Sequence, residues 1–284
     1  MKFIIGNIIV IVSIIGGYLM AHGKLGILWQ PAEVVIIFGA AVGAFITTNP
    51  GKVLKATLAG LPKLLSGSPY NKQAYMEVLA LMYELFTKAR KEGLMSLEPH
   101  VEEPESSDLF NKYPSILKDH GAVEFICDYL RMIVGGNMNA MELENLMDAE
   151  LDNHHHEADA PGAAVVTMGD GMPGFGIVAA VLGVIITMGS IGGSPAELGY
   201  HIAAALVGTF LGILLAYGFV GPMGNAMQAM AADEGKYLTC IKQCILATLN
   251  GYSPQVAVEF GRKVIDHADR PGFLELEEYV KQPR

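Results

Sequence analysis

The chain has 284 residues, of which 51% are hydrophobic and 17% are charged, and its formal net charge is −10. Soluble domains are usually about one quarter charged, so this composition is poor in charge. Three cysteines cannot all pair with one another, and the sequence shows neither a collagen-like repeat nor a low-complexity tract. A disulfide scaffold, a fibrous protein and a disordered chain are therefore excluded.

Charge is segregated along the chain. Of the 19 Lys and Arg residues, 17 lie in 50–170 and 221–284. Crossing a hydrocarbon core about 30 Å thick takes about 20 apolar residues. Four blocks approach this length, at about 3–21, 30–49, 172–190 and 198–220. The sequence thus predicts an all-α membrane protein with four transmembrane helices.

The first block follows Lys2 in the manner of a signal peptide, but its apolar run is too long and no small-residue cleavage site follows. It is therefore expected to be a retained helix. Glu33 is expected at the membrane–water interface beside Trp29 and Pro31, which leaves the apolar cores of the four blocks without Asp, Glu, Lys or Arg.

Short links join the blocks into two hairpins, at 1–49 and 171–221. Because basic residues concentrate on the cytoplasmic side, the large helical domain at 50–170, the helical tail at 222–284 and both termini are expected in the cytoplasm. The acidic surplus of these segments excludes nucleic-acid binding, which needs a basic surface.

Amphipathic patterns predict several cytoplasmic helices. The first, at 52–65, is expected to lie in the membrane surface against lipid, with packing on soluble helices as the alternative. Others are predicted at 72–90, 114–134, 138–151 and 233–249, near 253 and near 275.

Candidate metal and catalytic groups have simpler interpretations. His154, His155 and His156 stand in an acidic stretch and are interpreted as part of a solvated linker. Cys240 and Cys244 are expected to pack as small apolar side chains. No nucleophile–base arrangement or paired-carboxylate motif stands out, so neither an enzyme nor a cofactor nor a metal site is expected.

The fourth block carries a small residue every four positions, namely Ala204, Gly208, Gly212 and Ala216, and Gly39 and Gly43 do the same in the second. Such a face lets another helix approach closely. Packing within the chain and assembly with other chains both remain open. Thr187 and Thr209 are expected to bond back to their own helices.

Prolines mark the ends of the last two blocks. Pro173 and Pro222 are interpreted as terminal caps of the third and fourth helices. Ion pathways through a bilayer normally use intramembrane titratable groups. With none expected here, any titrating group would come from another chain.

Four motifs carry a resemblance to a known family. They are 88–98 (KARKEGLMSLE), 170–183 (DGMPGFGIVAAVLG), 207–222 (VGTFLGILLAYGFVGP) and 249–263 (LNGYSPQVAVEFGRK). The chain resembles the MotA family of flagellar-motor stator subunits, proton-driven inner-membrane proteins, over nearly its whole length. The resemblance implies a pentamer around the membrane helices of two MotB subunits, whose aspartate carries the ion.

The resemblance also assigns residues. It implies that Arg90 and Glu98 contact the rotor protein FliG, and that Pro173 and Pro222 couple ion passage to motion. Thr209 matches a hydroxyl position on the ion path. Ala180 occupies the third-helix position at which sodium-driven relatives carry a threonine, which favours the proton as the driving ion.

Two alternatives remain. An energiser of the ExbB or TolQ type also forms a pentamer around a partner helix, but those proteins have three membrane helices. A secondary transporter would need broken helices and polar groups near the midplane of the membrane, and the sequence predicts neither.

Overall fold

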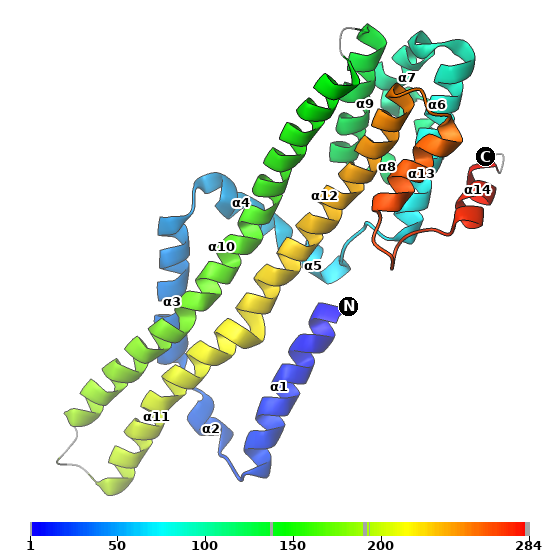
Figure 1. Ribbon diagram of the computed structural model, residues 1–284. Helices are drawn as coiled ribbons and strands as arrows, with labels where there is room; N and C mark the ends of the chain where they lie inside the picture. The colour runs from blue at the N-terminus through cyan, green and yellow to red at the C-terminus, as the bar shows by residue number, and fades with distance from the viewer. Residues whose placement is uncertain (1, 137–138, 190–191, 193, 282–284) are drawn as a thin grey trace. The chain divides into compact units, whose positions relative to one another are not determined.

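The structure is a computed structural model that describes residues 2–136, 139–189, 192 and 194–281. Within these ranges every regular element is a helix (Figure 1). The chain divides into two compact units, and each is described by itself. The first unit is Met1–Gly67 with Glu157–Met230, and the second is Ser68–His156 with Ala231–Arg284.

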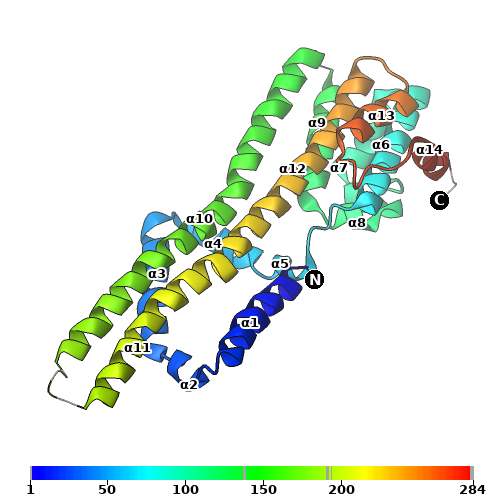
Figure 2. The same ribbon diagram turned by 60° about the horizontal axis from the view of Figure 1, so that its bottom comes forward.

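The first unit is built from long apolar helices. Its elements are α1 (Lys2–Met20), α2 (Leu25–Leu28), α3 (Pro31–Thr48), α4 (Gly51–Gly60), α5 (Lys63–Ser66), the later part of α10 (Ala140–Met188), α11 (Pro195–Ile213), the π-helical segment η4 (Leu214–Val220) and the start of α12 (Gly221–Leu249). Both α2 and α3 contact α11 (Figure 2).

Four helices are long and apolar enough to cross a membrane. Two are Lys2–Met20 and Leu25–Thr48, and the others lie within Ala140–Met188 and Pro195–Leu249. None of the described residues of α1 is buried in the single chain, and Ile8, Ile9 and Val12 expose about half of their surface or more. Such apolar faces suit lipid or another subunit. The expectation of an all-α membrane protein with four such helices is confirmed.

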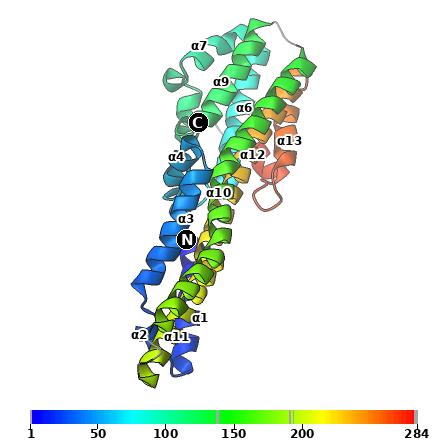
Figure 3. The same cartoon turned by 90° about the vertical axis from the view of Figure 1, so that its left-hand side faces the viewer.

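The second unit is a helical domain with its own core. It contains α6 (Lys72–Glu92), α7 (Glu98–Glu102), α8 (Pro114–Leu117), α9 (His120–Gly135), α13 (Pro254–Val264), α14 (Phe273–Lys281), the 3₁₀ turns Leu94–Leu97, Pro104–Ser106 and Phe110–Lys112, and parts of α10 and α12. Figure 3 shows α6, α9 and α13 close to one another, and all three contribute to the main cluster of buried apolar residues. Asn71 caps α6 by accepting hydrogen bonds from the N–H groups of Gln73 and Ala74.

Within the tail, the buried Arg262 joins α13 to the segment that follows it. Arg262 donates to both carboxylate oxygens of Glu259, at 2.8–2.9 Å, and to the carbonyl of Pro271 at 3.0 Å. Beside it, Gly261 allows α13 to approach α12 closely, because a Cβ atom there would collide with Cys244 Sγ. Cys240 and Cys244 are fully buried, in agreement with the packing role expected for them.

Two of the expected helices are broken near their starts or ends. The helix expected at 52–65 is divided into α4 and α5 around Pro62, whose nitrogen cannot donate a hydrogen bond. The helix expected at 114–134 is divided into α8 and α9, and Asp119 caps the start of α9 by accepting from Ala122 N–H.

The stretch expected to be a solvated linker, 150–160, is largely exposed, as expected, but it is no separate link, because these residues are helical inside α10. Six of its eleven residues are Asp, Asn or His, which are weak helix formers, so local propensity alone does not account for the helix. Two side-chain contacts to α12 hold it: His154 Nε2 lies 3.2 Å from Glu234 Oε1, and Gln228 donates to Asp159 at 3.1 Å.

Candidate functional site

A line of glycines on α10 forms the main contact between the last two membrane-crossing helices. We call Gly162, Gly169, Gly176 and Gly183 the glycine seam; they recur every seven residues. A Cβ atom on Gly176 would lie 2.9 Å from the carbonyl oxygen of Gly208, and one on Gly183 would lie 2.8 Å from the Cβ of Ala205. No larger side chain fits, so the two backbones meet directly.

Some of the small residues noted on the fourth block contact the glycine seam, and others are less buried. A Cβ atom on Gly212 would lie 2.8 Å from the carbonyl oxygen of Met172. Gly208 and Ala216 are also buried, whereas Ala204 is half-buried. Gly208 and Gly212 thus lie in a contact within the chain. In contrast, a Cβ atom on Gly43 would meet nothing within 4 Å in the single chain.

Both residues expected on the ion path lie beside this contact. A Cβ atom on Gly208 would be 3.2 Å from the backbone nitrogen of Ala180, and one on Gly176 would be 3.4 Å from Thr209 Cα. Thr209 and Ala180 are half-buried. Thr187 Oγ1 donates to the carbonyl of Gly183 at 2.8 Å, the local bond expected for it. The fold therefore brings Ala180 and Thr209 to one level of the helix pair.

The burial of Glu33 was not expected from the sequence. Its side chain belongs to the first turn of α3 and is 8% exposed, and its Oε2 lies 2.6 Å from where a Cβ atom on Gly208 would be. Glu33 was expected beside Trp29 and Pro31 at the start of its helix, and it does lie in that first turn, but α3 packs against α11 and buries the carboxyl group within the chain. An apolar pattern with one acid at its edge gives no sign of this packing.

The interpretation of the two prolines as helix caps was also wrong. Pro173 lies inside α10, and Pro222 lies inside the unbroken helical run from Pro195 to Leu249. A proline inside a helix lacks the N–H for the carbonyl four residues earlier and crowds it. Before Pro222 the helix widens into the π-helical segment η4. There the N–H of Gly221 donates to the carbonyl of Ala216, five residues earlier instead of four. Such π-turns are frequent at functional sites.

The expected rotor contacts lie in the second unit. Arg90 is in the last turn of α6, which stops at Gly93 with φ +90°, as the glycine predicts. Glu98 begins α7. Both side chains are exposed, and neither is paired with another side chain in the described part of the chain. The short turn Leu94–Leu97 between them fixes both charges to ordered elements.

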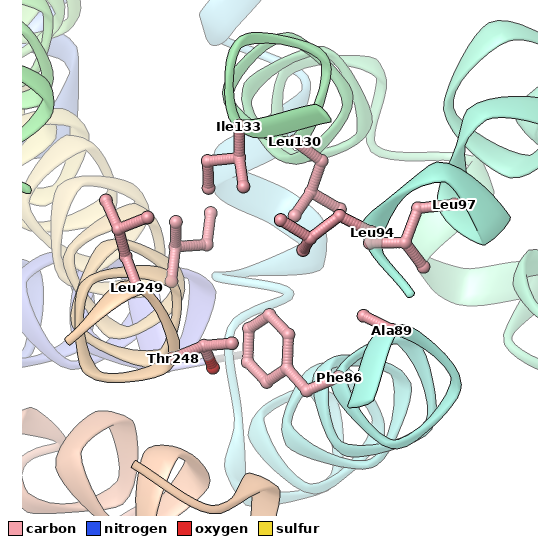
Figure 4. A pocket seen from close by; sticks show the side chains of 9 residues that line it. Phe86, Ala89, Leu94, Leu97, Leu130, Ile133, Thr248 and Leu249 are labelled. Carbon is pink, nitrogen blue, oxygen red and sulfur yellow. The ribbon is translucent and has the colours of Figure 1, made fainter. Parts of the chain in front are cut away.

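An apolar pocket lies beside Arg90. Its volume is about 120 Å³, and its lining residues are Phe86, Ala89, Leu94, Leu97, Leu130, Ile133, Ile245, Thr248 and Leu249 (Figure 4). A shallower hollow shares Phe86, Ala89 and Leu94 with it and is lined by Arg90 as well. Leu94, which lines both, is itself exposed, as is Met95, the next residue in the chain. Charge and apolar surface are thus adjacent here.

The histidine cluster has no metal-site geometry. Within the ranges that the structure describes, no group of three or more His, Cys, Asp or Glu side chains is placed to hold an ion. His155 and His156 are exposed on α10.

Comparison with known proteins adds an independent result. Residues 4–93 match the family model for the N-terminal part of motility protein A, and residues 119–239 match the MotA/TolQ/ExbB proton channel family. Motility protein A of Escherichia coli K12 is 49% identical over 99% of this chain and 95% of its own length. Chemotaxis protein LafT of Vibrio parahaemolyticus is 39% identical over 99% of both chains.

Solved structures agree with these relatives. A chain of the Campylobacter jejuni MotAB structure superposes with a TM-score of 0.79 at 22% identity, covering 94% of this chain and 96% of that one. A chain of the flagellar MotAB stator complex from Bacillus subtilis gives a TM-score of 0.74 at 25% identity, covering 90% and 92%. The chain belongs to the motility protein A family, within the MotA/TolQ/ExbB proton channel family.

Proposed function

We propose that this chain is the A subunit of a bacterial flagellar stator in the inner membrane. The observation that carries the proposal is the 49% identity to motility protein A along almost the whole of both chains. Four membrane-crossing helices, compared with three in ExbB and TolQ, favour the stator over an energiser of envelope transport. No catalytic role is part of the proposal.

The partner is a MotB-type subunit that supplies the ion-carrying aspartate. Two solved relatives are MotAB complexes. In this chain, the described membrane-crossing helices expose many apolar side chains, among them Ile8, Ile9 and Val12 of α1. Such surfaces support assembly of a pentamer around partner helices within lipid. We place both termini and the second unit in the cytoplasm, following the distribution of basic residues.

The rotor contact is formed by Arg90, Glu98 and the apolar pocket next to Arg90. An exposed ion pair contributes about 0–1 kcal/mol, so charge alone gives a weak, reversible contact. A buried apolar anchor contributes more. The pocket beside Arg90 supports a contact in which FliG inserts an apolar side chain while charges set the orientation.

Complementation tests the whole proposal. Cells lacking their own motility protein A should swim again when this chain is expressed with a MotB-type partner, and should not swim when the partner's membrane aspartate is replaced by asparagine. Cells lacking ExbB or TolQ provide the second arm. Rescue of those cells without rescue of swimming would support the energiser instead.

A further inference from the structure

Glu33 is a buried acid without a partner. Its side chain is 8% exposed, and no described group forms a hydrogen bond with its Oε2. Leaving a buried carboxyl group unpaired is costly, because water no longer solvates it. In membrane proteins, acids inside the apolar layer are rare and mark proton or ion pathways.

The contact with Gly208 places this acid beside the middle of a membrane-crossing helix. Gly208 is the fourteenth residue of α11, which begins at Pro195. At 1.5 Å per residue it lies about 20 Å along the helix from that end. This distance is more than half of the roughly 30 Å that a membrane-crossing helix needs. Oε2 lies 2.6 Å from the Cβ position of Gly208, next to Thr209 in the sequence.

A structural ion pair does not account for Glu33. The titratable groups of α11, which packs on α3, are Glu197, Tyr200 and His201, all in its first two turns and so at least about 10 Å along the helix from Gly208. Neither α2 nor residues 171–188 of α10 contain an ionisable side chain. Within the described part of the chain, then, no cation holds this carboxylate.

Its position on α3 favours a group that exchanges its proton. Glu33 lies in the first turn of the helix, where the backbone dipole stabilises negative charge. Its side chain nevertheless does not cap that helix end, since Oε2 points to α11. The apolar surroundings favour the neutral acid, while the helix end favours the anion. Opposing influences of this kind suit a group that passes through both forms.

We propose that Glu33 is a proton relay on the outer half of the ion path. Its carboxylate takes a proton from a hydronium ion, which leaves as water, and the resulting acid gives that proton to the carboxylate of the partner's membrane aspartate. Glu33 returns to the anion, so protons and charge balance. The inference rests on the proposed stator function.

The test uses the complete stator, expressed with its partner in cells that lack their own. The variants are E33Q, which cannot carry a proton, E33D, which carries one on a shorter side chain, and E197Q, which removes an exposed acid of the first turn of α11. Rotation speed is measured from mildly acidic to mildly alkaline medium, and recovery of the complex is measured by co-purification.

We expect E33Q to rotate at near wild-type speed in acid and to slow by about threefold in alkaline medium, because a relay matters most when protons are scarce; this is less than the roughly 10²-fold typical of an essential acid–base group. E33D should slow less, and E197Q should match wild type. Equal speeds for E33Q and wild type at every pH would overturn the relay, as would an equal, pH-independent loss in E33Q and E33D.

If E33Q is not recovered with its partner, the pH dependence of rotation speed in E33D tests the relay instead. A steeper loss of speed in alkaline medium than wild type supports the relay, and an unchanged profile overturns it. Failure of the stator function itself is seen separately, because the wild-type chain would then not restore swimming at all.

Discussion

Gly169 lies directly against the backbone of Gly221: a Cβ atom on Gly169 would be 3.1 Å from Gly221 N. The carbonyl of Gly169 is the one that Pro173 leaves without its helical donor, and Gly221 immediately precedes Pro222. The two proline sites are therefore in contact through their neighbours. Because the two sites touch, a shift of the backbone at one of them cannot occur without a shift at the other.

A larger side chain at Gly169 should push the two proline sites apart and lower the stability of the protein. In G169V, the added side chain has no room beside Gly221, and overpacking of this kind costs about 1–3 kcal/mol. We expect a lower melting temperature of the purified stator and loss of swimming. G174A is the matched control on the same helix, because a Cβ atom at Gly174 meets nothing within 4 Å. Equal stability of the two variants would show that the Gly169 contact is not tight.

Gly212 tests whether the small-residue face serves the chain itself or its partner. Its Cβ position lies 2.8 Å from the carbonyl of Met172 and 2.9 Å from Gly176 Cα. We therefore expect G212L to lower the amount of folded chain in membranes even without the partner. G43L, at an open position, should accumulate normally. Normal accumulation of G212L with loss of partner co-purification alone would place the face at the subunit interface.

Each charge at the rotor contact should account for only a small part of the swimming speed. We expect R90A or E98A alone to slow swimming, and R90E with E98K to slow it more, because each exposed pair contributes about 0–1 kcal/mol. E103K, an exposed reversal nearby, is the control. Opposite reversals on the rotor should restore part of the speed. Full swimming by the double reversal with an unchanged rotor would contradict the contact.

The membrane-crossing helices and the end of α6 could be predicted from the sequence. The four spans were predictable because apolar length alone decides whether a helix can cross a bilayer. The end of α6 was predictable because glycine readily adopts a positive φ, which often ends a helix, and φ is +90° at Gly93. Both features depend on local composition, which a single sequence displays directly.

Features that depend on a second helix were not predictable in this way. Pro173 and Pro222 were interpreted as helix ends because proline opposes helix locally, yet the helical runs continue through both of them. Glu33 was placed at the interface because nothing in its own segment shows the contact with Gly208. The seven-residue spacing of the glycine seam was present in the sequence and would have indicated a helix contact.

The three cysteines should resist alkylation in the folded protein. Cys127, Cys240 and Cys244 are 2% exposed or less. Burial raises the pKa of the Cys127 thiol to about 11 and raises that of Cys240 as well. Only the thiolate reacts quickly, so at neutral pH both remain as unreactive thiols. Mass spectrometry after iodoacetamide treatment should show no adduct on the native chain and three after denaturation. S106C, on an exposed turn, is the reactive control, and rapid native labelling of Cys127 would contradict its burial.

The driving ion should be the proton. A sodium ion sheds water only where several oxygen ligands are held together. At the level of the Gly176–Gly208 contact the chain offers the hydroxyl of Thr209 and the carboxyl group of Glu33, while Ala180 offers no side-chain oxygen, so fewer oxygen ligands gather there than a threonine at that position would give. A proton needs only titratable carboxyl groups and a hydrogen-bonded path.

Cells whose only stator contains this chain should swim in sodium-free medium and stop when a protonophore is added. A180T supplies a second hydroxyl beside Gly208 and tests whether oxygen ligands are what the site lacks: any dependence on external sodium should appear in this variant and not in wild type. Swimming of the wild-type strain that follows external sodium and survives the protonophore would show that backbone carbonyls complete a sodium site, and the proton assignment would then be wrong.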